Sequence, residues 1–267
     1  MEIIGYICAI LVGVSLGVLG SGGSILTVPI MVYLLSVNPV DATGYSLFVV
    51  GATSAVGCVT YLRKKLVDIK TAIIYAVPSI ICVFLTRKFL IPAIPNPIIT
   101  VSSWVLSKEL LTMILFALLM IVVSFNMIRK SSHPERAEKE FDSSNYLWLA
   151  GIGAASGLLM GILGVGGGFI IVPALVLLAR VPVRMSVGTS LLIIAFNSLG
   201  GFLGEVIERH EMIDYKFLIT FAALSVAGIF IGFRAARRRT PAQIKKMFGW
   251  FVLVMGICIL VKEVFWP

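Results

Sequence analysis

The sequence predicts an all-α integral membrane protein built from two related halves, and three observations lead to this prediction. The chain of 267 residues is 59% apolar and 13% charged, with a mean hydropathy of +1.04, whereas soluble domains are roughly 45 to 50% apolar and about 25% charged. Apolar runs of helix length recur along the whole chain. A glycine-rich stretch, GVLGSGGSILTVP at residues 17–29, returns as GILGVGGGFIIVP at residues 161–173.

Ten apolar segments account for the predicted helices. Crossing a bilayer takes about 20 predominantly apolar residues; eight of the segments approach this length, and two shorter ones follow the glycine-rich stretches. Because the runs are continuously apolar and do not alternate, they predict helices and exclude a membrane β-barrel. The segments cover residues 3–19, 24–35, 43–62, 71–90, 110–128, 146–163, 168–179, 186–206, 217–233 and 248–261.

The two halves are related by a tandem duplication. At a constant offset of 144 residues, seven of the thirteen positions in the glycine-rich stretches are identical, and the match continues from residues 42–47 to residues 186–191. The polar stretch 130–145 joins the halves and is predicted to be a cytoplasmic linker. We therefore expect one transmembrane repeat at 1–129 and a second at 146–267. Five segments per half predict that the second repeat is inverted in the membrane, which is the plan of many secondary transporters.

Positive charge is distributed unevenly over the loops. If all ten segments cross, sixteen of the 22 Lys and Arg residues fall on one side, and the positive-inside rule assigns that side to the cytoplasm. The net charge of +9 therefore reflects topology, and nucleic acid is not expected as a partner. We expect a multi-pass protein of the inner or plasma membrane in contact with lipid, and the sequence leaves a homodimer open.

The two short segments are about 18 Å long as helices, which is too short to cross comfortably. The glycine loops before them are therefore expected inside the membrane, where irregular backbone is tolerated only within protein or around a cavity. At the end of each loop a helix begins, and its free N–H groups are expected to point toward whatever occupies the loop. A purely structural hinge is the alternative interpretation. As substrate-binding loop residues we expect Ser21, Gly22, Gly23 and Ser24 in the first half, with Val165, Gly166, Gly167 and Gly168 in the second.

Polar side chains on the third segment of each half are expected beside these loops. Their hydroxyl and amide groups would supply further hydrogen bonds to a dehydrated oxyanion. Hydrogen bonding between helices is the alternative role for each of them. Three charged residues near segment ends are candidates for gating or coupling. The polar residues are Ser46, Thr53, Ser54, Thr189, Ser190, Asn197 and Ser198, and the charged ones are Asp41, Arg184 and Glu205.

Other site chemistries are not supported. The four cysteines and two histidines show no metal-ligand spacing, so neither a metal nor a cofactor is expected. The spans carry no HExxH motif and no Ser/His pairing, so an enzyme is not expected. A dinucleotide loop would follow a strand, whereas these loops follow apolar helices. Small residues spaced by four predict close helix packing; they are Gly13, Gly17, Gly153, Gly157 and Gly161.

The duplicated glycine loop followed by a proline, with a small-Gly-x-Ser-Leu segment after it, resembles the TauE/SafE family of sulfite and organosulfonate exporters. The resemblance covers both halves and the linker. It implies a membrane permease that exports a small anionic sulfur compound such as sulfite or an organosulfonate. The first loop departs from the pattern, with Ser21 and Ser24 where the second has Val165 and Gly168. The two halves therefore need not contribute equally to binding.

The distribution of charge bears on the transport mechanism. No charged residue lies near the middle of a long apolar segment, and intramembrane carboxylates often mark proton relays. Movement of a monovalent anion out of a negative interior is favoured by roughly 2.3 kcal/mol per 100 mV. Uncoupled export by alternating access is therefore the preferred hypothesis. An ion-coupled importer of another small anion and a non-transporting membrane scaffold are the alternatives.

Overall fold

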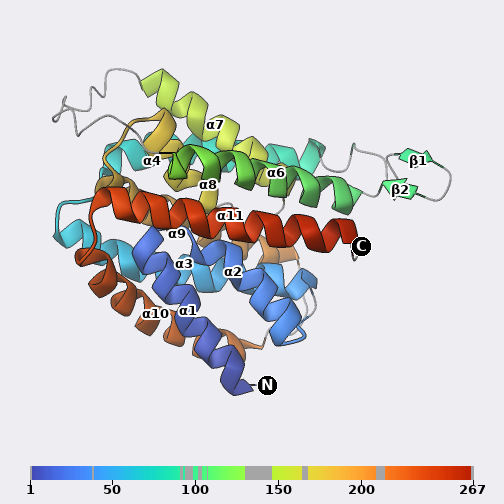
Figure 1. Ribbon diagram of the computed structural model, residues 1–267, viewed down its shortest axis with the longest axis horizontal. Coiled ribbons are helices and arrows are strands. Elements are labelled where there is room, and N and C mark those ends of the chain that lie inside the picture. Colours follow the sequence, from blue (N-terminus) through green and yellow to red (C-terminus); the bar gives the residue numbers. More distant parts are fainter. Residues whose placement is uncertain are drawn as a thin grey trace.

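The computed structural model describes residues 2–37, 39–90, 93, 99–101, 104–106, 108–129, 146–163, 168–208 and 214–265. These residues form helices, short turns and one two-stranded hairpin (Figure 1). In the hairpin, Val101 lies opposite Trp104. In chain order the elements are α1 (Glu2–Leu19), α2 (Gly23–Pro29), η1 (Ile30–Leu34), α3 (Pro39–Arg63), α4 (Ile69–Leu85), η2 (Thr86–Leu90), β1 (Ile99–Val101), β2 (Trp104–Leu106), α6 (Lys108–Ile128), α7 (Tyr146–Leu163), α8 (Gly168–Pro173), η3 (Ala174–Leu178), α9 (Val183–Glu208), α10 (Tyr215–Arg237) and α11 (Pro241–Phe265).

Each of the ten predicted apolar segments forms a helix, so the prediction of an all-α, multi-pass membrane protein is confirmed. The predicted linker at 130–145 lies outside the described residues. Within the described part of the chain, five helices are long and apolar enough to cross a membrane: Asp41–Arg63, Ile69–Leu90, Val183–Leu203, Tyr215–Arg237 and Ala242–Val261. Shorter apolar helices cover Gly5–Leu19, Gly23–Val32 and Tyr146–Ile162.

The two short segments have the same internal construction. Helix α2 changes into the π-helix η1 directly after Pro29, and α8 changes into η3 directly after Pro173. Proline donates no backbone hydrogen bond, and π-helical turns are rare and frequently found at functional sites. Beyond each π-helix lies a residue with positive φ, Ser36 at 54° and Arg180 at 55°. Corresponding features are 144 residues apart, which is the offset of the duplicated sequence.

The starts of α4 and α10 also match. Asp68 and Asp214 are their N-cap residues, and each accepts a hydrogen bond from the N–H three residues further on, at 3.1 and 3.0 Å. Such caps satisfy N–H groups that a helix start leaves unpaired. The N–H of Asp68 donates to Thr189 Oγ1, and the N–H of Asp214 donates to the Tyr45 hydroxyl, both at 3.1 Å. Each cap therefore ties its helix to the long third segment of the other half.

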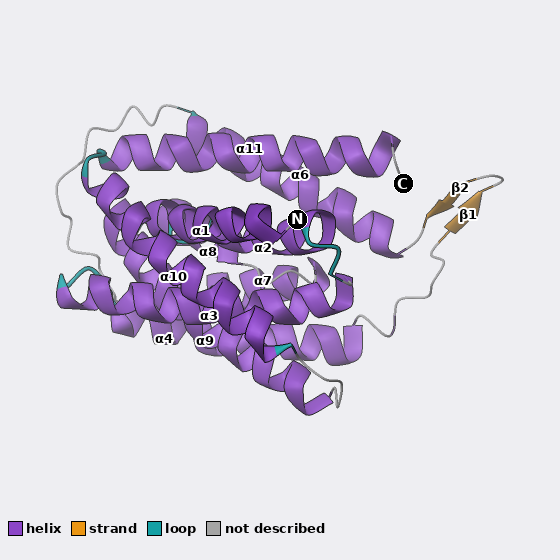
Figure 2. Cartoon of the chain, turned by 90° about the horizontal axis from the view of Figure 1, so that it is seen from below, coloured by secondary structure: helices purple, strands orange, loops and turns teal. Residues whose placement is uncertain are grey.

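The long helices pack in pairs, and each pair combines one helix from each half. Helix α1 packs along α10, and its counterpart α7 packs along α4; α3 packs along α9, and α6 along α11. Figure 2 shows the α6–α11 pair on one side, with α3, α4 and α9 on the other and α2 and α8 between them. Helix α2 contacts α3, α8 contacts α9, and α2 contacts α8. The two short helices are thus enclosed by longer ones.

Glycines bring the paired helices into close contact. A Cβ placed on Gly17 of α1 would lie 2.9 Å from the Cα of Gly232 on α10. A Cβ placed on Gly157 of α7 would lie 2.7 Å from the Cα of Ser79 on α4. Real Cβ atoms essentially never approach backbone atoms this closely, so a larger residue would force the helices apart. The prediction of small-residue packing is confirmed at these positions.

Candidate substrate site

The first glycine loop is a three-residue break between α1 and α2. Gly20 has a φ of +79°, which side chains of L-residues rarely adopt, and its N–H ends α1 by donating to Leu16 O at 2.8 Å. Gly22 is the N-cap residue of α2, and no side chain caps this helix. The N–H groups of its first turn therefore have no side-chain partner. Gly23 and Ser24, which were expected in the loop, form that first turn.

The start of α8 lies against the start of α2. A Cβ placed on Gly168 would be 2.9 Å from Ser24 Oγ and 3.1 Å from Ile194 Cδ1. A Cβ placed on Gly20 would be 3.0 Å from Ser190 Oγ. The face of α9 that carries Ser190 and Ile194 therefore adjoins both the first loop and the start of α8. The remaining predicted loop residues, Val165, Gly166 and Gly167, lie outside the described residues.

Helices α3 and α9 run antiparallel, and two contacts set their register. Leu199 Cδ2 of α9 lies 2.9 Å from the position that a Cβ would take at Gly51 of α3. About one and a half turns further along α3, Leu191 Cδ1 lies 3.4 Å from an ideal Cβ at Gly57. Residues 53 and 54 of α3 fall between these contacts. They are therefore within about one turn of the level of residues 197 and 198 of α9.

Five polar side chains on the first loop, α3 and α9 have buried polar atoms with no hydrogen-bond partner. Buried polar atoms in proteins are nearly always paired, and leaving one unpaired costs roughly 1 to 3 kcal/mol. A ligand with polar atoms would satisfy them. We call these five residues, all of which the sequence predicted, the polar group: Ser21, Thr53, Ser54, Asn197 and Ser198. The unpaired atoms are the hydroxyl oxygens of the Ser and Thr residues and both amide atoms of Asn197.

Two members of the polar group share a helix face with a residue that contacts a short helix. Asn197 and Ser198 follow Ile194, the residue that contacts the start of α8, by one helical turn, so the three share a face of α9. Thr53 and Ser54 hold the corresponding places on α3, 144 residues earlier. Ser198 is 1% exposed and the other hydroxyl-bearing members are fully buried. The site is therefore formed where α3 and α9 meet the starts of α2 and α8.

Four other predicted residues have partners within the protein. Ser24, Ser46 and Ser190 each donate to a backbone carbonyl three residues earlier, at 2.8, 2.8 and 2.9 Å. Thr189 accepts from the N–H of Asp68, near the N-terminal end of α9. The bond between Thr189 and Asp68 joins two helices, whereas the other three bonds are local to their own segments.

The site is polar but uncharged. The helices that form it carry no Lys, Arg, Asp or Glu within six residues of the polar group's positions on α3 and α9. Asp41 lies at the start of α3, about 18 Å along the helix from Thr53. Arg184 is exposed and donates to Arg239 O at 3.4 Å, so the structure brings neither residue to the polar group. Glu205 lies on α9, with its side chain outside the described residues.

Tyr75 of α4 is a polar residue that sequence reasoning missed. Its side chain is fully buried and its hydroxyl makes no hydrogen bond. Ser156 of α7 is close to it; the Ser156 hydroxyl donates to Ile152 O of its own helix at 2.7 Å and keeps lone pairs that can accept. Helix α4 starts beside Thr189 and packs along α9, which brings Tyr75 near the level of Asn197. The counterpart in the other half is Phe221, so comparing the halves was the signal available in the sequence.

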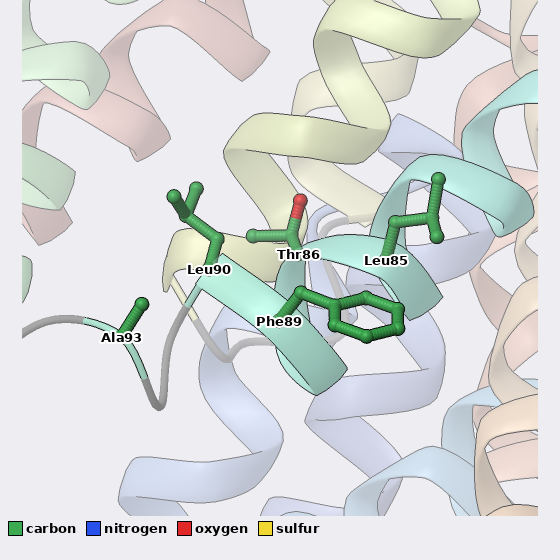
Figure 3. Close-up of a pocket in the computed structure, with 5 residues that line it drawn as sticks. All are labelled: Leu85, Thr86, Phe89, Leu90 and Ala93. Carbon is green, nitrogen blue, oxygen red and sulfur yellow. The ribbon is translucent and has the colours of Figure 1, made fainter.

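A hollow of about 310 Å³ lies elsewhere, at the end of α4 and along η2. Figure 3 shows its lining, in which the hydroxyl of Thr86 is the single polar side-chain atom drawn. None of the predicted site residues lines it; the lining residues are Leu85, Thr86, Phe89, Leu90 and Ala93. An anion needs several donors to replace its water. We therefore place the candidate site at the polar group and not in this hollow.

Comparison with known proteins identifies the family. A family model described as sulfite exporter TauE/SafE matches residues 5–259. The chain belongs to this family. A probable membrane transporter protein of Xylella fastidiosa is 28% identical over 254 residues, which cover 94% of this chain and 91% of the relative. Probable membrane transporter proteins of Methanocaldococcus jannaschii and Bacillus subtilis (YunE) are each 26% identical, covering 94% and 97% of this chain and 94% and 98% of the relatives.

No solved structure matched the chain significantly. The protein is a membrane transporter of the TauE/SafE family, and the resemblance noted from its glycine loops is confirmed. The part of the chain that matches the TauE/SafE model includes both loops and every member of the polar group.

Proposed function

We propose that this TauE/SafE transporter exports small anionic sulfur compounds, such as sulfite or an organosulfonate, by alternating access around the polar group. One observation carries the proposal: five residues with buried, unpaired polar atoms lie on the first loop and on facing stretches of α3 and α9, and these two helices contact α2 and α8. The description of the family as sulfite exporters supports the sulfur-anion class.

The chemistry of the polar group favours an anion. Four of its members are hydroxyls, which can turn their protons toward an acceptor, and the amide of Asn197 adds two N–H groups. The first turn of α2 is not capped by a side chain, and it follows Ser21 of the polar group directly, so the positive end of its helix dipole adds a favourable potential for an anion there. An oxyanion that leaves water needs such converging donors.

The relation between the halves supports alternating access. The packing of α1 on α10 is matched by that of α7 on α4, and the caps at Asp68 and Asp214 make matching bonds. Two halves of similar construction can exchange conformations, so that a site between them opens to one side and then to the other. We infer that the five segments of each half place the halves in opposite orientations in the membrane.

The membrane potential supplies a driving force for export. An inside-negative potential favours outward movement of a monovalent anion by roughly 2.3 kcal/mol per 100 mV. Such export requires no coupled ion, and the polar group contains no carboxylate. The first acidic residue after it on α9 is Glu205, eight residues beyond Asn197.

The test is anion flux in proteoliposomes that contain the purified full-length protein, with the potential set by potassium and valinomycin. Sulfite, sulfoacetate and thiosulfate are compared with sulfate and chloride. We expect saturable movement of a sulfur anion toward the positive side, and no effect of a pH gradient on sulfoacetate, whose charge does not change near neutral pH. The proposed function is refuted if none of the sulfur anions moves.

A second arm of the same assay tests for ion coupling. Flux that follows an imposed pH gradient, and loses this dependence in Glu205→Gln, would replace the uncoupled exporter with the ion-coupled alternative. Glu208→Gln is the matched control, because Glu208 is the last residue of the same helix. Flux that ignores the gradient in all three proteins supports uncoupled export.

A further inference from the structure

Asn197 differs from the rest of the polar group in what it requires of a ligand. A hydroxyl rotates to suit its partner, so Thr53, Ser54 and Ser198 can each donate to a ligand that only accepts hydrogen bonds. A carboxamide instead holds two N–H donors and one carbonyl acceptor in a fixed plane. A ligand that only accepts would pair with Nδ2 of Asn197 and leave Oδ1 unpaired.

Both amide atoms of Asn197 are buried and neither has a partner. Turning the amide by 180° exchanges the two atoms, so an unpaired donor and an unpaired acceptor are present in either orientation. Asn197 lies in the interior of α9, where the backbone N–H groups bond within the helix and cannot serve the carbonyl. The first half has Thr53 at the corresponding position, so the unpaired carbonyl belongs to the second half.

We propose that Asn197 makes this transporter selective for anions that carry a hydrogen-bond donor of their own, such as hydrogensulfite or a hydroxyalkanesulfonate. The charged oxygens accept from the hydroxyls and from Nδ2, and the O–H of the substrate donates to Oδ1. The selectivity rests on the proposed function of the site. A site built to hydrogen-bond a substrate O–H rejects the analogue without it, because its own buried group is left unpaired.

Ethanesulfonate and 2-hydroxyethanesulfonate provide the test, since they carry the same charge and differ by one hydroxyl group. The ratio of their apparent affinities is measured in proteoliposomes at a fixed potential. We expect the wild-type protein to prefer the hydroxy compound about tenfold, which corresponds to about 1.4 kcal/mol. Removing the extra hydroxyl from water opposes this preference. A site without a matching acceptor would therefore favour ethanesulfonate.

Three variants assign the preference to one side chain. Asn197→Thr introduces the residue that the first half carries at position 53, and we expect it to transport ethanesulfonate and lose the preference. Ser198→Ala removes a donor, so it should weaken binding of both anions and keep their ratio. Phe196→Leu changes a neighbouring side chain that is 58% exposed. It should leave the affinity for both anions and the ratio of the two affinities unchanged. A ratio within one variant does not depend on how much protein folds.

Each way in which the selectivity can fail is distinguishable from failure of the proposed function. Equal affinities, or preference for ethanesulfonate, in the wild-type protein overturn the selectivity and leave the function intact. A preference that persists in Asn197→Thr overturns the assignment to Asn197. If sulfite moves but neither sulfonate is transported or competes with it, the selectivity is overturned and the proposed function stands. No flux of any of the sulfur anions, the two sulfonates included, refutes both.

Discussion

The two halves of this transporter share a backbone plan but differ in the side chains at the site. Each half has a short helix that becomes π-helical after a proline, and each has an aspartate cap tied to the other half. The sequences differ around the glycine loops: Ser21 of the first loop and Ser24 of the first turn of α2 correspond to Val165 and Gly168.

Further along, Thr53 on α3 corresponds to Asn197 on α9, and Phe221 on α10 corresponds to Tyr75 on α4. Symmetry of the backbone and symmetry of the site therefore serve different needs under the proposed function. Matching backbones would let the site open to either side in turn. Unlike side chains would suit the asymmetric substrates that we propose.

The largest expected effect comes from filling the junction between the halves. Gly168→Val places side-chain carbons at the position that is 2.9 Å from Ser24 Oγ and next to Ile194, so we expect it to abolish flux of sulfite in proteoliposomes. Gly151→Val is the matched control, because a Cβ at Gly151 meets nothing within 4 Å. Equal flux from the two variants would contradict a site at this junction.

A smaller effect is expected from removing one hydroxyl on each side of the site. Ser54→Ala and Ser198→Ala each remove an unpaired donor. Each should therefore raise the sulfite concentration that gives half-maximal flux about tenfold. A loss confined to one half would show that the substrate contacts that half alone. Ser124→Ala, which removes a buried hydroxyl that already donates to Ile121 O at 2.7 Å, should leave the affinity unchanged.

The matching caps are expected to contribute to stability in both halves. Asp68→Ala and Asp214→Ala should each lower the free energy of unfolding by about 1 kcal/mol, measured by thermal unfolding in detergent. Asp68 also accepts from Thr71 Oγ1 at 2.6 Å, so its loss should be the larger of the two. Asp214→Asn keeps a capping oxygen and should unfold like the wild-type protein. A larger loss at Asp214 would count against this account.

The smallest expected effect on transport comes from exchanging the aromatic residues of the two halves. Tyr75→Phe removes a buried hydroxyl that has no hydrogen bond, so we expect a higher unfolding temperature and a change in sulfite affinity of about threefold or less. Phe221→Tyr buries a new hydroxyl in the other half and should lower the unfolding temperature. If Tyr75→Phe destabilises the protein, its hydroxyl has a structural partner.

The sequence was sufficient to predict the helices and to single out the members of the polar group, because both leave local marks. Apolar composition over a fixed length specifies a membrane helix wherever the helix packs. Consecutive glycines destabilise a helix and mark a break, and Ser54 and Ser198 are recognisable as polar residues within apolar runs. The duplication then showed that both features recur at one offset.

The tertiary structure decided which polar groups are hydrogen-bonded and which residues lie close together. Ser225 and Ser198 are both serines within apolar helices, yet Ser225 donates to Ala9 O of α1 at 3.0 Å and Ser198 is unpaired. Thr189 is bonded to Asp68, 121 residues away, and Tyr75 comes near the level of the site only because α4 packs along α9. Sequence by itself determined which segments are helical and where they break, since those properties depend on neighbouring residues. Which polar atoms remain for a ligand depends on the helix that lies alongside, so only the packed structure could decide it.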